Sequence, residues 1–323
     1  MTRYFNRLAA SWVTLMCLGT SVLAQTWPTK PIKIQIAFGP GSASVIFARM
    51  IGEPLSRAVG QRVIVESKPG AAGQIAAEFV ARAPADGYTL FLTTNTKHSA
   101  NPYLFKKLSY DPIKDFTPIS RILYFPFLLV VDGELPINNI AELLTYAKAN
   151  PQQIGYSYSS SAGQVPAAAL SNATKMGAVG VAYKSAPEAL NSVVGGQVTF
   201  SIIDFATSQA LIKAGRLRAL AVTPQTRTTL APNLPTISEA VGIKDFGVTA
   251  WLGLFGPANL PVAIVDKLNT EIQKILGSHE LQEKLRSMGV EPTPAGPEEF
   301  QQFVKSQLGV WQQQIKISGM EPQ

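Results

Sequence analysis

The sequence predicts an α/β protein of two domains with a ligand cleft between them. Strand-like and helix-periodic segments alternate along the first hundred residues, and the alternation restarts after Asp115. Two β-prone runs, Ile119 to Val131 and Val248 to Phe255, are long enough to pass from one unit to the other. Two α/β units joined by two such crossings favour a hinged architecture, in which a small molecule binds between the halves.

The first unit shows a β-α-β-α-β order, which predicts a mainly parallel sheet. Its strands are short β-prone runs, and its helices have apolar residues at helical spacing. The expected elements are a strand from Pro31 to Phe38, a helix from Ala43 to Val59, a strand from Arg62 to Glu66, a helix from Ala72 to Ala83 and a strand from Tyr88 to Thr93.

The second unit repeats the alternation, and the chain then ends in helices. Its expected elements are helices at 140–149, 167–176, 187–194 and 207–214, and strands at 154–158, 179–183, 198–203 and 217–222. Three helices are expected after Phe255, and we interpret their apolar stripes as packing faces. We therefore assign residues 25–124 and 250–323 to a discontinuous first domain and residues 125–249 to a second domain.

The N-terminus, residues 1–24, is typical of a cleavable signal peptide. Arg3 and Arg7 precede a short apolar run, and Val22 and Ala24 fit the −3 and −1 positions of a cleavage site. A membrane anchor is the alternative, but the run is shorter than the roughly 20 residues that span a bilayer. The sequence thus predicts export and a periplasmic location.

The cysteine content and the charge exclude several kinds of site. Cys17 is the only cysteine and lies within the signal peptide, so the mature chain should have no disulfide, thiolate metal site or cysteine nucleophile. The 28 basic and 21 acidic residues are scattered rather than clustered, which argues against nucleic-acid binding. The modest positive excess could steer small anions toward the protein or serve only solubility.

The sequence offers little for catalysis or for metal binding. His98 and His279 are the two histidines; His279 begins an expected surface helix, whereas His98 follows a strand at a loop position that could face a cleft. No Gly-x-Ser-x-Gly elbow and no His-Glu-x-x-His pair is present. We expect no enzyme, no catalytic residue, no metal and no cofactor. Gly39-x-Gly41 is only a partial dinucleotide fingerprint, since Ser44 stands where the third glycine would be.

Two loops, at 38–44 and 159–164, predict anion binding. Each is rich in glycine or serine, follows a strand and leads toward a helix, whose first N–H groups have no partner within the helix. One such loop in each domain could hold both ends of a small diacid. The alternative is an ordinary turn in the first loop and N-capping serines in the second.

Short motifs spread from about Trp27 to the C-terminus carry a family resemblance. They are Trp27-Pro-Thr-Lys-Pro-Ile, Phe38-Gly-Pro-Gly, Val65-Glu-Ser-Lys-Pro-Gly-Ala-Ala-Gly, Pro84-Ala-Asp-Gly-Tyr-Thr-Leu, His98-Ser-Ala-Asn-Pro, Tyr110-Asp-Pro-Ile-Lys-Asp-Phe, Ala182-Tyr-Lys, Gly195-Gly-Gln-Val, Lys213-Ala-Gly-Arg-Leu-Arg-Ala-Leu-Ala-Val, Leu234-Pro-Thr-Ile and Trp251-Leu-Gly-Leu-Phe. Because these motifs follow one another in this order, the chain resembles the solute-binding receptors of tripartite tricarboxylate transporters, which are called the Bug family.

The resemblance implies a two-domain periplasmic binding protein of type II, a Venus flytrap with the ligand cleft between its domains. It implies a monomer that captures a small carboxylate and delivers it to the membrane permease subunits of such a transporter, without a cofactor. It also implies that the loops at Gly41–Ser44 and Ser159–Gln164 hold the carboxylates, partly through ordered water.

Departures from the family pattern bear on the ligand. A second glycine is usual where this chain has Ser42, and an aspartate is usual where it has Val45, with Phe47 nearby. Glycines are also usual at the positions of Ser161 and Ser185. Loss of the acid removes a partner for a ligand ammonium group. We therefore expect a dicarboxylate without an ammonium group and with a flat or apolar middle, such as terephthalate; a linear diacid or citrate is the alternative.

The candidate ligand-binding residues lie on these loops and after neighbouring strands, where ligands usually meet open α/β sheets. They are Phe38, Gly41, Ser42, Ala43, Ser44, Asn95, His98, Ser159, Ser161, Ala162, Gly163, Gln164 and Asp204. Asp204 either lines the cleft or caps the next helix. Trp251 either stacks on a ligand or packs at the hinge.

Two other functions remain open from the sequence. A receptor of the same fold could pass its signal to a membrane kinase, and gene neighbours would separate this sensor from a transport receptor. An extracytoplasmic hydrolase would require His98 to reach a serine.

Overall fold

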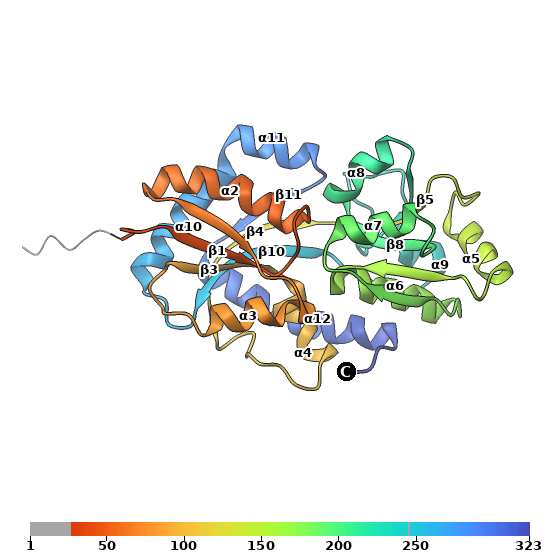
Figure 1. Cartoon of the computed structure of the whole chain (residues 1–323), viewed down its shortest axis with the longest axis horizontal. Helices are drawn as coiled ribbons and strands as arrows, with labels where there is room; N and C mark the ends of the chain where they lie inside the picture. Colours follow the sequence, from red (N-terminus) through yellow and green to blue (C-terminus); the bar gives the residue numbers. More distant parts are fainter. Residues whose placement is uncertain (1–26, 245) are drawn as a thin grey trace, which may run out of the picture.

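The computed structural model describes residues 27–244 and 246–323, without the side chain of Glu291. The predicted signal peptide lies outside these residues. The described chain forms two α/β lobes side by side, each built on its own sheet (Figure 1). The predicted alternation of strands and helices is confirmed.

The sheet of the first lobe has six strands in the order β11-β4-β10-β3-β1-β2. The strands are β1 (Ile32–Ile36), β2 (Val63–Ser67), β3 (Thr89–Thr94), β4 (Phe116–Phe125), β10 (Ala250–Pro257) and β11 (Glu291–Ala295). β1 pairs in parallel with β2 and β3, whereas β10 runs antiparallel between β3 and β4.

The sheet of the second lobe repeats this plan with five strands, in the order β7-β6-β8-β5-β9. The strands are β5 (Phe127–Asp132), β6 (Gly155–Tyr158), β7 (Val179–Ala182), β8 (Phe200–Asp204) and β9 (Leu217–Val222). β6 pairs in parallel with β7 and β8, and β5 runs antiparallel between β8 and β9. In each lobe, an antiparallel strand that comes from the other lobe lies beside three parallel strands, so both sheets are mixed rather than mainly parallel.

Helices cover both faces of each sheet. They are α2 (Ala43–Val59), α3 (Gln74–Ala81), α4 (Asn101–Leu104), α5 (Ile140–Ala149), α6 (Ser161–Ala173), α7 (Ala186–Val194), α8 (Phe205–Lys213), α9 (Ile237–Val241), α10 (Val262–Gly277), α11 (His279–Ser287) and α12 (Pro297–Ser318), with short turns η1 (Ala71–Gly73) and η2 (Thr96–Ala100). In the first lobe, α2 and α10 contribute to one core cluster, and α3 and the first part of α12 (Phe300 and Val304) contribute to another on the opposite face of the sheet.

The chain crosses between the lobes at two adjacent places. The β-prone run from Ile119 to Val131 is split at Pro126 into β4 and β5, which belong to different sheets, because proline donates no ladder hydrogen bond. Thr223, which follows β9, links the two crossing segments by hydrogen bonds. Its Oγ1 accepts from the Phe127 N–H at 3.3 Å in the first crossing, and its carbonyl accepts from the Val248 N–H at 2.9 Å in the second.

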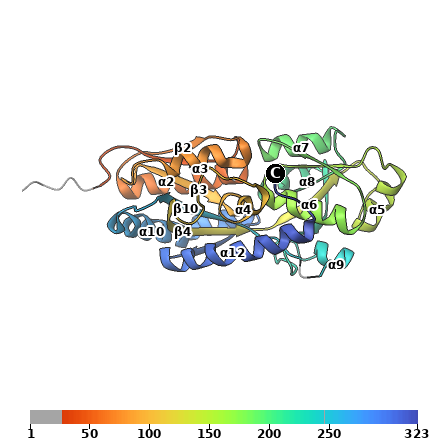
Figure 2. The same cartoon turned by 90° about the horizontal axis from the view of Figure 1, so that it is seen from below.

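Helix α12 makes a further connection between the lobes. It packs against β4 of the first lobe and against α6 of the second, and Figure 2 shows it running beneath both. Its apolar stripe is buried as predicted, with Phe300, Val304, Trp311 and Ile315 each less than 5% exposed.

Several elements differ from the sequence prediction, and the short helices α4 and α9 were not predicted. Helix α6 begins at Ser161 rather than at Ala167, so the predicted loop at 159–164 is mostly the first turn of a helix. Pro166 is the sixth residue of α6 and lies inside the helix, where it cannot donate to the carbonyl of Ala162. Strand β11 was not predicted because it contains Pro292 and Pro294, which suit only an edge strand such as this one.

None of the helices in the described part of the chain combines the length and the apolar character that crossing a bilayer requires.

Candidate functional site

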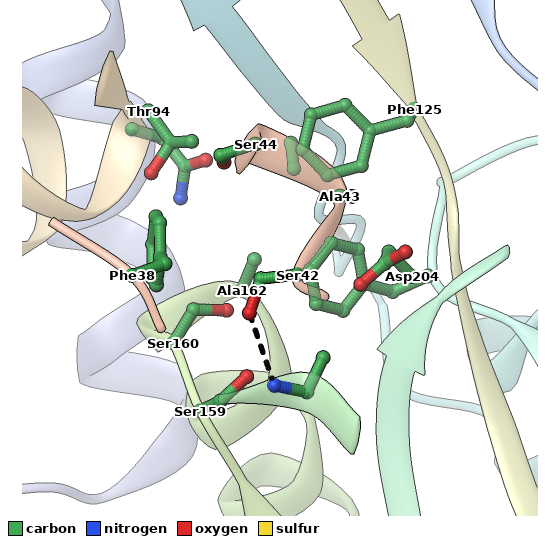
Figure 3. Close-up of a pocket in the computed structure, with 14 residues that line it drawn as sticks. Phe38, Ser42, Ala43, Ser44, Thr94, Phe125, Ser159, Ser160, Ala162 and Asp204 are labelled. Atoms are coloured by element: carbon green, nitrogen blue, oxygen red, sulfur yellow. Dashed lines mark hydrogen bonds between the residues drawn. The ribbon is translucent and has the colours of Figure 1, made fainter. Parts of the chain in front are cut away.

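A cavity lies between the lobes, where β1, β3, β6 and β8 reach their carboxyl ends (Figure 3). We call it the first cavity, and its volume is about 20 Å³. It is lined by Phe38, Ser42, Ala43, Ser44, Thr94, Asn95, Phe125, Phe127, Ser159, Ser160, Ala162, Ala186, Asp204 and Ala250. This is the edge at which open α/β sheets bind ligands.

Helix α2 brings its N-terminus to the first cavity. Ser42 is the N-cap residue, and its side chain makes no cap hydrogen bond; its carbonyl accepts from Val45 and Ile46. The N–H groups of Ala43 and Ser44 have no hydrogen-bond partner within the described chain. Because both residues line the cavity, these two donors and the positive end of the helix dipole face it.

Helix α6 presents a matching N-terminus from the second lobe. Its N-cap residue Ser160 also makes no side-chain cap, and its carbonyl accepts from Gly163 and Gln164. The N–H groups of Ser161 and Ala162 thus have no partner within the described residues.

At four other helices of the second lobe, the side chain of the N-cap residue accepts a hydrogen bond from the first turn, whereas at α6 it does not. The caps are Asn139 on α5, Ser185 on α7, Asp204 on α8 and Thr236 on α9. Two uncapped N-termini that meet at one cavity can hold two anionic groups through backbone donors.

Buried side chains with unused hydrogen-bonding groups line the same cavity. Asn95 is 0% exposed, and neither its Oδ1 nor its Nδ2 has a partner among the described residues. The Oγ of Ser160 is buried and equally without a partner there. Because buried polar groups are nearly always hydrogen-bonded, these atoms are available to a ligand or to water.

Aromatic rings form the apolar part of the wall. Phe125 and Phe127 stand on either side of the Pro126 crossing, with their ring centroids 5.8 Å apart, and Phe38 lies at the end of β1. The sequence had placed this wall at Val45 and Phe47. Both are buried in the core of the first lobe, and neither lines the cavity.

Among the described residues that line the first cavity, Asp204 is the one that is acidic. It follows β8 and caps α8, accepting from the Thr207 N–H at 2.8 Å, so both alternatives from the sequence are realised. Burial raises the pKa of its carboxyl above the ordinary value, although the hydrogen bonds from Thr207 oppose the shift.

Hydrogen bonds hold the two lobes together around this cavity. The Gly39 N–H donates to the Lys184 carbonyl at 3.2 Å, and the Ser42 hydroxyl accepts from the Ala186 N–H at 3.2 Å (Figure 3). On the α6 side, the Ser161 hydroxyl donates to Thr96 Oγ1 at 3.0 Å. The lobes are therefore closed on one another.

His98 lies in the core of the first lobe rather than at the cleft. It is 0% exposed, its ring stacks on Phe255 with centroids 4.0 Å apart, and its Nδ1 is 2.8 Å from the Pro112 carbonyl. Burial lowers the pKa of its imidazole to about 4. The η2 segment after β3 is a single π-helical turn; it directs His98 into the core, while Asn95, which precedes it, lines the first cavity.

The structure brings together most of the residues singled out in the sequence. Eight of them line the first cavity: Phe38, Ser42, Ala43, Ser44, Asn95, Ser159, Ala162 and Asp204. Ser161 and Gln164 line a neighbouring second cavity. Gly41 and Gly163 line neither, but both sit at close approaches: a Cβ on Gly41 would lie 2.9 Å from the Pro187 ring, and one on Gly163 would strike the Ile202 carbonyl.

Sequence reasoning missed several lining residues. They are Thr94, Phe125, Phe127, Ala186 and Ala250, whereas Ser160 lies within the predicted loop at 159–164 but was not singled out. Pro126 inside the long β-prone run was the available signal for the pair of phenylalanines. Trp251 is fully buried against Phe300 and Phe303, so of its two alternatives the structure shows packing.

Within residues 27–244 and 246–323, no group of three or more His, Cys, Asp or Glu side chains is arranged to hold a metal ion.

Comparison with known proteins places this geometry in a family. The sequence model of the tripartite tricarboxylate transporter family receptor matches residues 47–320. A UPF0065 protein of Bordetella bronchiseptica is 32% identical over 299 residues, which cover 93% of this chain and 89% of that protein.

Solved structures show the same fold. Rpa4515 of R. palustris, determined with adipate, has 33% identity and a TM-score of 0.87, with 92% of this chain and 100% of that chain covered. The periplasmic binding protein BugD has 32% identity and a TM-score of 0.86 at the same coverage. MatC of Rhodopseudomonas palustris, with bound malate, has 27% identity and a TM-score of 0.84, covering 90% and 100%. The predicted fold of a two-domain periplasmic binding protein is confirmed.

Proposed function

Because the chain belongs to the tripartite tricarboxylate transporter receptor family, we propose that it is a periplasmic receptor, without enzymatic activity, for a small dicarboxylate. The ligand has an apolar middle and no ammonium group, and the receptor delivers it to the membrane subunits of a tripartite tricarboxylate-type transporter.

One observation carries the proposal: two helices, one from each lobe, bring uncapped N-termini to the same cavity. Backbone N–H groups of Ala43 and Ser44 on one side and of Ser161 and Ala162 on the other are unpaired within the described chain. Each pair, with its helix dipole, suits one carboxylate. A diacid that bridges the pairs would favour the closed arrangement of the lobes.

The wall between the two N-termini supports an apolar middle for the ligand. Phe38, Phe125 and Phe127 face the cavity, whereas Asn95 and Ser160 offer only neutral polar groups. Adipate in Rpa4515 and malate in MatC are both dicarboxylates without an ammonium group. A cavity of about 20 Å³ has room for about one water molecule, so the lobes must separate or the side chains must move when such an acid enters.

Asp204 is already engaged within the protein, because its carboxyl caps α8. Burial raises the pKa of this carboxyl above its ordinary value, so it holds a proton more readily than an exposed aspartate does. In its protonated form it can donate a hydrogen bond to a ligand carboxylate.

A thermal-shift screen tests the function. Adipate, succinate, malate, citrate and terephthalate are compared with hexanoate, benzoate, aspartate and glutamate. A ligand at 100 times its Kd adds about 2.7 kcal/mol to the free energy of unfolding. We expect stabilisation by one or more of the diacids.

Two variants of α6 locate the site. Ala162→Leu fills the first cavity and should abolish the shift, whereas Ala168→Leu, farther along the same helix, should preserve it. Stabilisation by aspartate or glutamate alone would contradict the proposed ligand class, and a shift that survives Ala162→Leu would contradict the proposed site.

A further inference from the structure

Lys97 is a fully buried lysine with no visible partner. It lies in η2, is 1% exposed, and its Nζ has no hydrogen-bond or ion-pair partner among the described residues. The Nζ lies 3.5 Å from the centroid of the Phe38 ring. Lysines are almost never fully buried unless they are paired, and the described chain offers the Lys97 amine the Phe38 ring but no hydrogen-bond acceptor or carboxylate.

The fold makes room for this side chain. Gly73, with φ +85°, packs directly on it, and a Cβ at that position would collide with Cε of Lys97. The amine is thus held between the Gly73 backbone and the Phe38 ring, at the wall of the second cavity.

The second cavity is the larger of the two between the lobes. Its volume is about 440 Å³, against about 20 Å³ for the first, and it shares Phe38, Ser159 and Ser160 with it. Phe38 and the two serines therefore form a wall common to both. A ligand larger than a few atoms that binds at the helix N-termini must extend into this space or force the lobes apart.

The second cavity favours an anion. Lys97 and the exposed Lys184 line it, and no aspartate or glutamate side chain is among its described lining residues. The other titratable groups that line it are the phenols of Tyr158 and Tyr183 and the α-carboxylate of the C-terminal residue Gln323, so two amines are set against one carboxylate; His98 is the neighbour of Lys97 in η2. The Gln164 side chain, which donates to the Tyr158 hydroxyl at 3.0 Å, adds neutral hydrogen-bonding groups.

We propose that the second cavity is a subsite for the far carboxylate of an elongated dicarboxylate, and that Lys97 is the charged partner of that carboxylate. This inference rests on the proposed function and refines it for an elongated diacid: the N-termini of α2 and α6 together hold the near carboxylate, instead of one carboxylate at each N-terminus. The apolar middle of the ligand then passes beside Phe38, whose ring lines both cavities. The receptor would thereby select diacids by length.

Burial lowers the pKa of Lys97, which favours a neutral amine until an anion arrives. A carboxylate that enters the second cavity would restore the charged form, so binding should take up a proton.

Calorimetry with a matched pair of ligands tests the subsite. Adipate and hexanoate share a six-carbon chain and differ in one carboxylate. Lys97→Met should weaken adipate binding about tenfold or more and change hexanoate binding less than about twofold. Titrations in phosphate and Tris buffers should show that the wild type takes up more protons with adipate than Lys97→Met does.

Two further variants complete the test. Lys148→Met removes the same charge from the exposed face of α5 and should leave adipate binding unchanged. Lys97→Gln gives a second measurement if the methionine variant does not fold. Adipate binding within twofold of wild type in the Lys97 variants overturns this inference alone, whereas a wild type that binds none of the screened acids overturns the proposed function as well.

Discussion

The Ser42 hydroxyl accepts a hydrogen bond from the Ala186 backbone N–H at 3.2 Å, across the cleft between the lobes. Ser42 is the N-cap residue of α2 but does not cap its own helix. Ala186 is the first residue of α7, whose N-terminal N–H groups have no partner within that helix. One serine therefore leaves its own helix open to the first cavity and caps a helix of the opposite lobe.

We expect Ser42→Ala to shift the protein toward an open arrangement. The variant removes one neutral hydrogen bond, worth about 0.5–1.5 kcal/mol, while the fold of each lobe stays intact. Small-angle X-ray scattering of the protein without ligand should report a larger radius of gyration. The exposed Ser306→Ala on α12 is the matched control, and an unchanged radius for Ser42→Ala would show that this contact does not hold the lobes closed.

The second contact across the cleft joins Ser161 of α6 to Thr96 of η2 through their hydroxyls at 3.0 Å. We expect Ser161→Ala and Thr96→Val to be coupled, with an interaction energy of about 0.5–1.5 kcal/mol in a double-mutant cycle of unfolding free energies. Additive effects of the two substitutions would mean that this hydrogen bond contributes nothing to closure.

Asp204 should make the protein less stable as the pH rises. Because burial raises its native pKa above the unfolded value of about 3.9, the folded state holds the proton more tightly, and this contribution fades as the pH passes through the native pKa. Asp204→Asn keeps the acceptor for Thr207 without the charge. The difference in unfolding free energy between Asp204→Asn and wild type should shift in favour of the variant as the pH rises from 4 to 7.

The exposed Asp266→Asn on α10 is the control for this measurement and should show no such trend. A constant difference between Asp204→Asn and wild type over the same range would contradict the account of Asp204.

His98 should contribute the opposite pH dependence. Its native pKa of about 4 lies below the ordinary value of about 6.5, so the folded state holds the neutral ring. Its stabilising contribution is complete above pH 6.5 and is lost as the pH falls to about 4, a loss of about 3 kcal/mol. Nuclear magnetic resonance should show one imidazole that does not titrate between pH 6 and pH 8.

The variant His279→Gln assigns the two imidazole signals. If the signal of His98 titrates in that range, the imidazole is not buried as the structure has it.

Local patterns in the sequence were sufficient for most of the secondary structure. Helices α2 and α5 and strand β9 begin and end at the predicted residues, because apolar spacing and end signals agree there. The start of α6 was hidden by Ser159-Ser-Ser-Ala-Gly, since serine and glycine suit a turn and a helix N-terminus equally well.

The side-chain directions at the site depend on tertiary structure. Asn95 and His98 are three residues apart, yet the η2 turn places one at the first cavity and the other in the core. Val45 and Phe47 lie next to the predicted loop in sequence, but in α2 both are buried in the core of the first lobe. The aromatic wall comes instead from Phe125 and Phe127, which reach the cavity only because the chain changes lobes at Pro126.

A crystal structure of the complex with the most stabilising diacid tests the central claim most directly. The account predicts one ligand carboxylate within about 2.7–3.2 Å of the backbone N–H groups of Ala43 and Ser44, directly or through one water. It also predicts an apolar middle against Phe38. A ligand bound outside the two cavities, or one whose carboxylates contact neither α2 nor α6, would contradict it.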